Sequence, residues 1–196
     1  MPESDDLPEA EDLPEADDLP EAERTSDSGP GELLAQLLNA LPDGQAMSVL
    51  MACCGATSWA RGMIESRPFV TDEDVLLAAA DLWWNLTAND WNEAFGAHPR
   101  IGDRSMGREG WAAAEQSGAA GASLATIEAL ATGNAAYEER FGHVFLICAT
   151  GKSAEEMLGA LQGRMANEPE AELLIAAREQ AKITGLRLNK LVQSGP

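Results

Sequence analysis

The chain has 196 residues, of which 45% are hydrophobic, and it carries a formal net charge of −20 at pH 7. A chain of this length is expected to fold as one domain of ordinary size, with room for a terminal tail. Its negative charge argues against nucleic acid and against an anionic membrane surface as partners, because both would repel it.

The chain begins with a low-complexity acidic segment. Over residues 5–22, the sequence Asp-Leu-Pro-Glu-Ala recurs around Leu7, Leu13 and Leu19. The prolines block a continuous helix, the acidic side chains repel one another, and the few leucines bury too little surface to offset the entropy of the chain. We expect residues 1–29 to be a disordered acidic tail, more often a solubilising segment than a docking motif. Residues 30–196 are expected to form the folded domain.

The folded part is expected to be all-α. Its apolar residues recur at helical spacing, and no run alternates with the period of two that is typical of a half-buried strand. The short connections between the expected helices favour a single-domain helical bundle. Up to the first histidine these helices cover residues 32–41, 45–54, 58–67, 71–84 and 89–96, with Ser58 and Thr71 as N-caps.

His98 follows the last of these helices and is one of only two histidines. Pro99 holds the backbone after it in a bent, stiff conformation, and Arg100 and Arg104 add positive charge to an acidic chain. Histidine changes charge near neutral pH, so a rigid, cationic histidine segment suits an acid/base site for an anion. The alternative, that His98 only caps the preceding helix and bonds a carbonyl, is equally open from this segment alone.

Beyond a glycine-rich loop, three more helices are expected, over residues 123–141, 153–165 and 169–192. Ser123 is the expected N-cap of the first, and Ser153 with Glu156 forms a capping box for the second. Residues 144–149 form a short apolar run that fits a buried strand or a buried helix, since periodicity cannot separate them. The last helix has apolar residues near one face, namely Leu173, Leu174, Ala177, Ile183 and Leu186.

Other polar residues carry weaker signals. Glu115 and Gln116 are adjacent, so on a helix both could face a cleft only near its end, and an exposed surface pair is the favoured interpretation. Arg164 closes a helix, where arginine usually forms a salt bridge or faces the helix dipole, yet its planar guanidinium could also bind a substrate carboxylate. His143 is expected to be a loop or rim residue without a catalytic role.

The cysteines and the missing motifs limit the chemistry further. Cys53, Cys54 and Cys148 make an odd number, and two of them are adjacent, so no disulfide framework is implied and a reducing interior suits them. No metal-ligand set and no nucleotide-binding loop is visible, so neither a cofactor nor a metal is expected. Without an apolar run long enough to span a bilayer, or a signal peptide at the start, we expect a soluble, cytoplasmic protein.

Several motifs, taken in order, resemble one family. They are Cys54-Gly-Ala-Thr-Ser-Trp59, Arg67-Pro68-Phe69, His98-Pro-Arg-Ile-Gly102, Glu115-Gln116, Asn134-x-x-Tyr137, Arg140-Phe-Gly142, Phe145-Leu-Ile-Cys-Ala149-Thr-Gly151-Lys152, Arg164-x-x-Asn167, Glu172-Leu173 and Lys182-Ile-x-x-Leu-Arg187-Leu188. Through these motifs the chain resembles the 2-oxo-4-hydroxy-4-carboxy-5-ureidoimidazoline (OHCU) decarboxylases, enzymes of urate breakdown, over roughly residues 31–192.

The resemblance implies an all-helical, cofactor-free enzyme, usually a homodimer, that acts on a small molecule. It would convert OHCU to (S)-allantoin with loss of CO2, in purine degradation. By resemblance His98 is the acid/base group, Glu115 and Gln116 hold the hydroxyl and ureido groups, and Arg164 binds an anionic or carbonyl oxygen. Further contacts would come from Pro99 in the wall of the pocket and from backbone groups of Phe145, Leu146, Ile147, Cys148 and Ala149.

One position departs from the family pattern. The family commonly has a serine three residues before the Glu-Gln pair, where this chain has Ala112. Ala112 would still line the site, but a hydrogen bond of about 0.5–1.5 kcal/mol is missing or comes from another group such as Ser105. Two alternatives stay open: a non-catalytic helical interaction protein with a decayed pocket and an acidic docking tail, and a decarboxylase of a related ureido compound.

Overall fold

The computed structural model describes residues 32–100 and 122–193. Every regular element within these two ranges is a helix, which confirms the all-α prediction. The expected tail, residues 1–29, lies outside the described ranges, so the boundary between tail and domain stays a prediction. The helices are α1 (Leu33–Ala40), α2 (Asp43–Cys53), α3 (Thr57–Glu65), α4 (Asp72–Trp84), α5 (Ala88–Gly96), α7 (Leu124–Phe141), α8 (Ala154–Arg164) and α9 (Pro169–Gln193).

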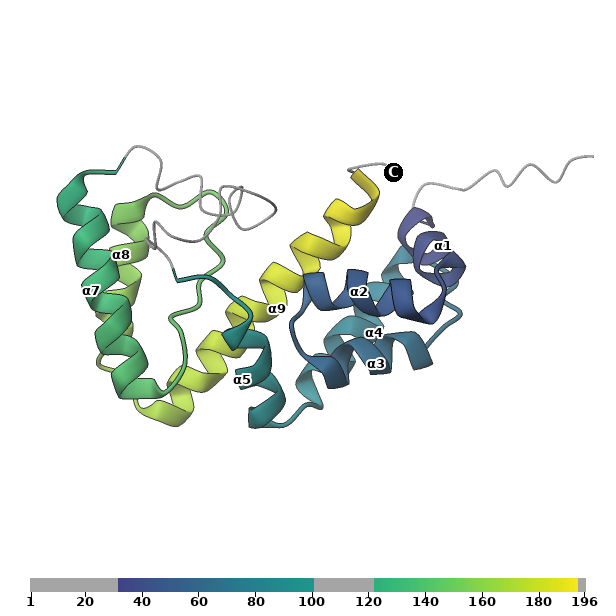
Figure 1. Cartoon of the computed structure of the whole chain (residues 1–196), viewed down its shortest axis with the longest axis horizontal. Coiled ribbons are helices and arrows are strands. Elements are labelled where there is room, and N and C mark those ends of the chain that lie inside the picture. Colours follow the sequence, from purple (N-terminus) through teal and green to yellow (C-terminus); the bar gives the residue numbers. More distant parts are fainter. Residues whose placement is uncertain (1–31, 101–121, 194–196) are drawn as a thin grey trace, which may run out of the picture.

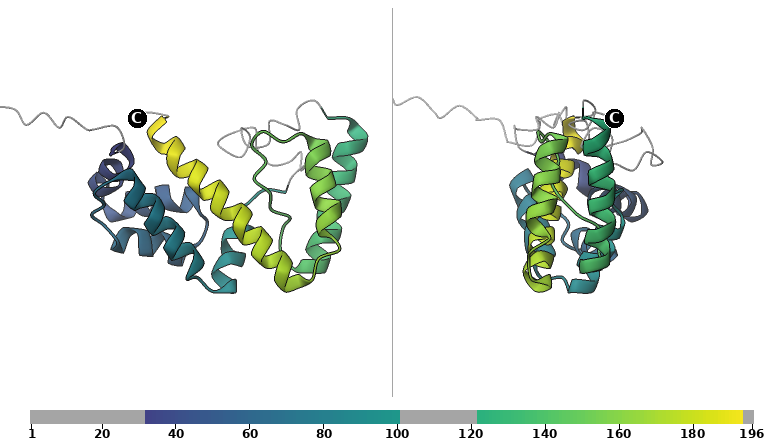
Figure 2. Two further views of the ribbon diagram at one scale, coloured as in Figure 1. Left: turned by 180° about the vertical axis from the view of Figure 1, so that it is seen from behind. Right: turned by 90° about the vertical axis from the view of Figure 1, so that its left-hand side faces the viewer.

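The long helix α9 joins two groups of helices. Figure 1 shows α1 to α4 packed together at the right, the pair α7 and α8 at the left, and α9 running diagonally from the foot of that pair to α1. The two views of Figure 2 show the same arrangement from behind and from the side. Helices α1, α2, α4, α5 and α7 all contact α9, while α8 packs on α7. The 25-residue helix α9 is therefore the central helix of the bundle, on which most of the other described helices pack.

Several helix ends follow the expected capping chemistry. Thr71 and Ser153 each form a capping box, and the Ser123 side chain accepts a hydrogen bond from the Thr126 N–H, as predicted. Gly142 closes α7 with a φ of 77°, a conformation that favours glycine. At these ends the local sequence sets the helix boundary.

The prediction for Ser58 is wrong, because α3 begins after Ala56 and Ser58 lies within its first turn. Ala56 has no side chain that can cap, and Glu93 of α5 takes this role instead. Its carboxylate accepts the Thr57 N–H (3.2 Å) and the Thr57 hydroxyl (2.6 Å). Ser58 donates to Asp90 of α5 (2.7 Å). These contacts fix the start of α3 against α5.

Two clusters of buried apolar residues hold the bundle together. The large core gathers α1 to α5, one face of α9 and Leu146, and it includes the fully buried Trp59. The small core lies between α7 and α8. Its buried members are Leu130, Tyr137, Phe145, Ile147, Ala149, Ala154, Met157 and Leu161. The buried face of α9 also holds the polar residues Glu172, Gln180, Thr184 and Arg187, whereas Leu174, expected near an apolar face, is 45% exposed.

The apolar run 144–149 forms neither a helix nor a strand of a sheet. Its side chains nevertheless alternate in direction. Phe145, Ile147 and Ala149 belong to the small core, while Leu146 belongs to the large core and its neighbours Val144 and Cys148 pack there as well. Alternation with a period of two is the pattern of an extended backbone. We refer to residues 143–149 as the extended segment; it separates the two cores.

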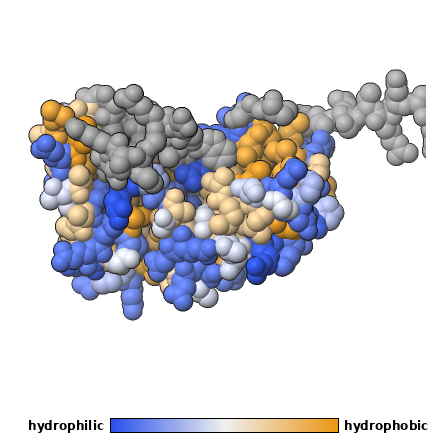
Figure 3. Space-filling view, in the orientation of Figure 1, coloured by the Kyte–Doolittle hydropathy of each residue, from blue (hydrophilic) through white to orange (hydrophobic). Residues whose placement is uncertain are grey.

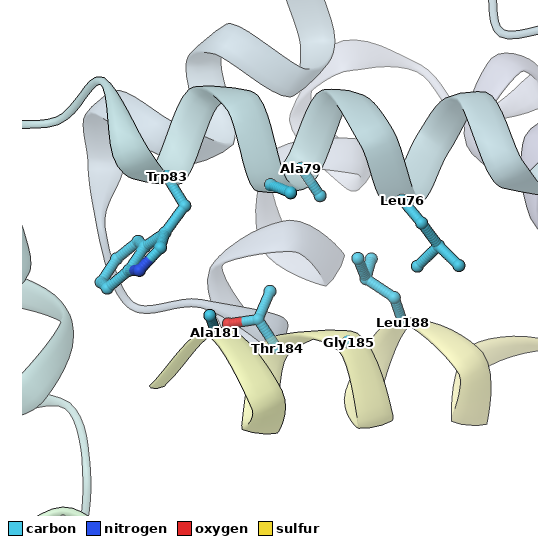
Figure 4. A pocket seen from close by; sticks show the side chains of 8 residues that line it. Leu76, Ala79, Trp83, Ala181, Thr184, Gly185 and Leu188 are labelled. Carbon is cyan, nitrogen blue, oxygen red and sulfur yellow. The ribbon is translucent and has the colours of Figure 1, made fainter. Parts of the chain in front are cut away.

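The surface is mixed. In Figure 3 the apolar areas lie over the N-terminal helices at the right and the upper end of α7 at the left, and the rest of this face is mainly polar. A pocket of about 70 Å³ opens between α4 and α9. Figure 4 shows its mainly apolar lining, with Trp83 and Thr184 at one end and Leu76 and Leu188 at the other. No titratable side chain is among the described residues that line it.

None of the described helices is long and apolar enough to cross a bilayer.

Candidate active site

His98 lies just beyond the C-terminal end of α5, as the sequence predicted. A capping box of Thr87 with Asp90 starts this helix, which ends at Gly96, and the His98 N–H donates to the Phe95 carbonyl (3.1 Å). The neighbouring Ala97 packs on Gly55, where a Cβ would meet the Ala97 Cβ at 2.4 Å. Only glycine allows this close approach, so the connection between α2 and α3 fixes the backbone that carries His98.

Two contacts on either side of His98 tie it to α7 and to the extended segment. The Phe95 ring lies 5.2 Å from the His143 ring, measured between centroids. Arg100 forms two hydrogen bonds with the Glu138 carboxylate of α7, at 2.6 and 2.7 Å. His98 is half-buried between these contacts. The chain on both sides of His98 is therefore tied to α7 and to the extended segment.

Arg164, at the end of α8, holds the middle of the extended segment. Its Nη1 donates to the Leu146 carbonyl (2.7 Å), and its guanidinium lies 4.7 Å from the centroid of the Phe145 ring. Its Nε donates to Glu172 of α9 (2.6 Å), and its side chain is 12% exposed. Of the two roles that the sequence left open, the salt bridge is present. Contact with a substrate stays a prediction.

The partner of Arg164 is a carboxylate without solvent exposure. Glu172 is 0% exposed, and its Oε1 accepts hydrogen bonds from Tyr137 and Arg164. Its Oε2 accepts from the Asn167 side chain (2.6 Å). Arg164 also donates from Nη2 to the Tyr137 hydroxyl (3.2 Å). A buried charge is tolerated only when it is paired and hydrogen-bonded, and this cluster meets both conditions.

A second carboxylate of α9 holds the extended segment one residue further along. Glu179 accepts the Cys148 N–H through Oε2 (2.8 Å) and binds Lys182 through Oε1 (2.6 Å). Burial raises the pKa of Glu179, but the hydrogen bonds from Lys182 and from the Cys148 N–H outweigh burial, so the pKa falls below its usual range. Glu179 is therefore ionised at neutral pH.

His143 is a loop residue, as predicted, but it is buried rather than on a rim, with 8% exposure. Its Nδ1 lies 3.1 Å from the Val144 carbonyl, and its ring contacts those of Phe95 and Tyr137. Burial lowers the pKa of His143, so the imidazole is neutral at pH 7 and its Nδ1–H donates to that carbonyl.

The sequence analysis gave no role to Arg187 of α9. This buried cation is 9% exposed and donates from Nη1 to the Ala52 carbonyl (3.2 Å), so it lies beside the connection that also packs on Ala97. The sequence did contain a signal for this residue, because Arg187 interrupts a helix face whose other predicted members are apolar.

Burial raises the pKa of Cys53 to about 12 and that of Cys54 to about 11, so both thiols stay protonated at neutral pH.

The structure thus brings together part of the predicted site. Arg164 contacts Phe145 and Leu146 of the extended segment. The neighbours of the half-buried His98 and Pro99, namely Phe95 and Arg100, contact His143 of that segment and Glu138 of α7. The candidates Ala112, Glu115 and Gln116 lie outside the described residues, so their placement stays a prediction. Within the described ranges, no three His, Cys, Asp or Glu side chains group in a way that could hold a metal ion.

Comparison with known proteins decides the family. Residues 39–189 match the family described as OHCU decarboxylase. The chain belongs to the OHCU decarboxylase family. The match covers every described site residue and the extended segment, so the motifs that suggested the resemblance all fall within it.

Individual relatives of the OHCU decarboxylase family agree. A uric acid degradation bifunctional protein, TTL, of Arabidopsis thaliana is 42% identical over 152 residues, which cover 71% of this chain and 45% of that protein. The chain therefore spans about half the length of this plant relative. An OHCU decarboxylase of Amia calva is 31% identical over 132 residues, covering 65% of this chain and 75% of that one.

Solved structures of similar proteins share the fold. A crystal structure of an OHCU decarboxylase, determined in the presence of (S)-allantoin, superposes with a TM-score of 0.67 at 39% sequence identity, covering 78% of this chain and 99% of that one. An (S)-allantoin synthase superposes with a TM-score of 0.62, covering 80% of this chain and 53% of that one. At 19% identity, this second likeness supports the fold alone.

Proposed function

We propose that this chain is a decarboxylase that converts OHCU to (S)-allantoin and CO2 in urate degradation. The observation that carries the proposal is the family match over residues 39–189, which includes His98 and the extended segment. The relative crystallised with (S)-allantoin supports the same chemistry, because this compound is the product expected here.

The reaction sets clear demands on the protein. The bond between the carboxylate carbon and the ring breaks, CO2 leaves, and the adjacent C=N group accepts the electron pair. One proton is then added to one face of a ring carbon, and this step sets the chirality of the product. The site therefore has to bind an anion, hold the ring in one orientation and move a proton.

His98 is the proposed group that moves the proton. Its backbone is fixed by the hydrogen bond to Phe95 and by the packing of Ala97 on Gly55, so the imidazole extends from a fixed point of the chain. A positioned imidazole contributes about 10²–10⁴-fold to the rate of a proton transfer. Glu115 and Gln116 are proposed to bind the hydroxyl and ureido groups, with Ala112 beside them.

The proposed binding groups for the ring and the anion are backbone dipoles and cations. Pro99 would form a wall of the site, and backbone groups of residues 145–149 would contact the ring. Arg164 is the proposed cation from the sequence, and Arg187 is a second, because it lies beside the connection that supports His98. Fixed dipoles and charges of this kind stabilise developing charge without reorganising during the reaction.

The test is OHCU turnover. Urate oxidase and hydroxyisourate hydrolase would generate fresh OHCU, and circular dichroism would follow the formation of (S)-allantoin. We expect the wild-type chain to accelerate it and His98→Asn to lose about 10²–10⁴-fold in kcat, because asparagine keeps a polar side chain but cannot shuttle the proton. Asn92→Ala, an exposed change in α5, the helix that precedes His98, is the matched control with wild-type turnover.

Two outcomes contradict the proposal. If the wild-type chain forms (S)-allantoin no faster than the blank, the activity is wrong. If His98→Asn turns OHCU over at the wild-type rate, the activity stands but the role of His98 is wrong. Thermal unfolding of each variant shows whether a lost rate reflects a lost fold.

A homodimer and a cytoplasmic location are part of the same proposal. Large apolar side chains of α4, Leu77 at 61% and Trp84 at 45% exposure, offer surface that a second copy could cover. Cys53, Cys54 and Cys148 are free thiols, which suits a reducing compartment.

A further inference from the structure

The extended segment has an unusual kind of support. An extended backbone normally pairs with a neighbouring strand, but this one is held by two charged side chains of opposite sign. Arg164 of α8 binds the Leu146 carbonyl (2.7 Å), and Glu179 of α9 binds the Cys148 N–H (2.8 Å). These two bonded groups belong to the peptide units that flank Ile147.

The geometry of an extended chain then fixes where Ile147 points. In a trans peptide unit the C=O and the N–H point in opposite directions. Because the Leu146 carbonyl points to Arg164, the Ile147 N–H points to the other edge of the segment. Because the Cys148 N–H points to Glu179, the Ile147 carbonyl points to that other edge as well. One residue therefore presents a donor and an acceptor side by side, away from α8 and α9.

The two charges also change the strength of these groups. A guanidinium on the Leu146 carbonyl draws electron density along the peptide unit, which makes the Ile147 N–H a stronger donor. A carboxylate on the Cys148 N–H pushes density in the opposite sense, which makes the Ile147 carbonyl a stronger acceptor. Hydrogen-bonded groups polarise one another in this way, particularly in a low-dielectric interior.

We propose that Arg164 and Glu179 are positioning residues that fix and polarise Ile147 as a donor–acceptor pair for the ring amide of the substrate. A ring amide presents the complementary pair, because its C=O accepts from the Ile147 N–H and its N–H donates to the Ile147 carbonyl. The proposal rests on the proposed function, since it names how that substrate is held. It adds a role of Arg164 through Leu146 to the contact with an anion that is proposed above.

Both positioning residues are themselves held rigidly. Glu172 and Tyr137 bind the guanidinium of Arg164, which also stacks on Phe145. Lys182 donates to Oε1 of Glu179, the carboxylate oxygen that does not bind the Cys148 N–H. Glu172 and Glu179 are seven residues apart on α9, which places them on one face of the helix, two turns apart. The same face of one rigid helix therefore supports both ends of the Ile147 unit.

The experiment removes one charge and keeps the shape. Glu179→Gln retains an oxygen that can accept the Cys148 N–H, whereas Glu179→Leu cannot accept it, and Glu170→Gln on the same helix is the matched exposed control. We expect the KM for OHCU and the calorimetric Kd for (S)-allantoin to rise about three- to tenfold in Glu179→Gln and more than about tenfold in Glu179→Leu. The kcat should stay within about twofold, and Glu170→Gln should match wild type.

A purely structural role gives a different result. If Glu179 only supports the fold, its loss lowers the folded fraction and hence the apparent kcat, while KM and Kd stay at wild-type values. That pattern overturns the proposal, as does a folded Glu179→Gln variant with wild-type KM and Kd.

A readout without substrate separates this proposal from the proposed function. The ¹³C shift of the Ile147 carbonyl in NMR spectra reports its polarisation, and we expect it to move upfield in Glu179→Gln and not in Glu170→Gln. An unchanged shift overturns the proposal even if OHCU is turned over. If the wild-type chain fails to turn OHCU over but the shift moves, the proposed function is wrong while the polarised Ile147 unit stands.

Discussion

At the scale of single residues, Glu172 shows how this interior holds a charge. The carboxylate is fully buried and accepts hydrogen bonds from Tyr137, Arg164 and Asn167. Arg164 in turn depends on Glu172 for its counter-charge. Removing one member of a buried pair leaves the other charged in a low dielectric, which costs far more than losing a surface pair.

We predict that Glu172→Gln lowers the free energy of unfolding by about 3–5 kcal/mol, because it leaves the Arg164 guanidinium buried without a counter-charge. Asp43→Asn is the matched control. Asp43 also pairs with an arginine, Arg67, but its side chain is 83% exposed, so the expected loss is at most about 1 kcal/mol. Urea unfolding followed by circular dichroism measures both. If both variants lose the same free energy of unfolding, the buried pair contributes no more to stability than the exposed pair, and the prediction is wrong.

The sequence alone predicted where His98 lies but not that Glu172 is buried. His98 could be found because a histidine before proline at a helix end is visible in the chain itself. Glu172 could not, since a glutamate in the first turn of a helix looks like an exposed dipole partner. Its burial depends on Tyr137 and Arg164, which lie 35 and 8 residues away. Sequence spacing gives no sign that three such residues meet.

At the scale of elements, the helices were predictable and the extended segment was not. Local signals such as the capping box of Ser153 and the terminal Gly142 set helix ends through nearby backbone groups. The run 144–149 was ambiguous because its backbone partners are the side chains of Arg164 and Glu179, contributed by later helices. Ser58 was misplaced for a similar reason, since the cap of α3 comes from Glu93 of α5.

The pair α7 and α8 provides a prediction at this scale. Gly133 of α7 faces α8, where a Cβ would meet the Leu161 Cδ2 at 2.4 Å, while Gly159 of α8 has open space around it. Gly159→Ala should raise stability by about 0.5–1 kcal/mol through helix propensity. Gly133→Ala should lower it, because displacing the buried Leu161 costs about 1–3 kcal/mol and exceeds the same gain. Thermal unfolding measures the two shifts, and a rise in both variants would show that α7 and α8 can separate without cost.

At the scale of the whole molecule, the extended segment lies where the two cores meet. The large core holds the connection beside His98, the small core holds the Tyr137 cluster, and the extended segment contributes side chains to both. A change in either core therefore reaches the site through the position of that segment. The acidic residues 1–29 lie before the family match, which begins at residue 39.

Deleting residues 1–29 tests whether the acidic tail has a part in turnover. The deletion removes twelve acidic residues and Arg24, so the formal net charge changes from −20 to −9. At about 150 mM salt, where the Debye length is about 8 Å, we expect kcat and KM for OHCU within about twofold of wild type. At about 10 mM salt the screening length is about 30 Å, and kcat/KM for the anionic substrate should rise because a less negative protein repels it less. Lost turnover at both salt concentrations would mean instead that the tail is required for the reaction or for the fold, and thermal unfolding of the truncated chain would separate these two causes.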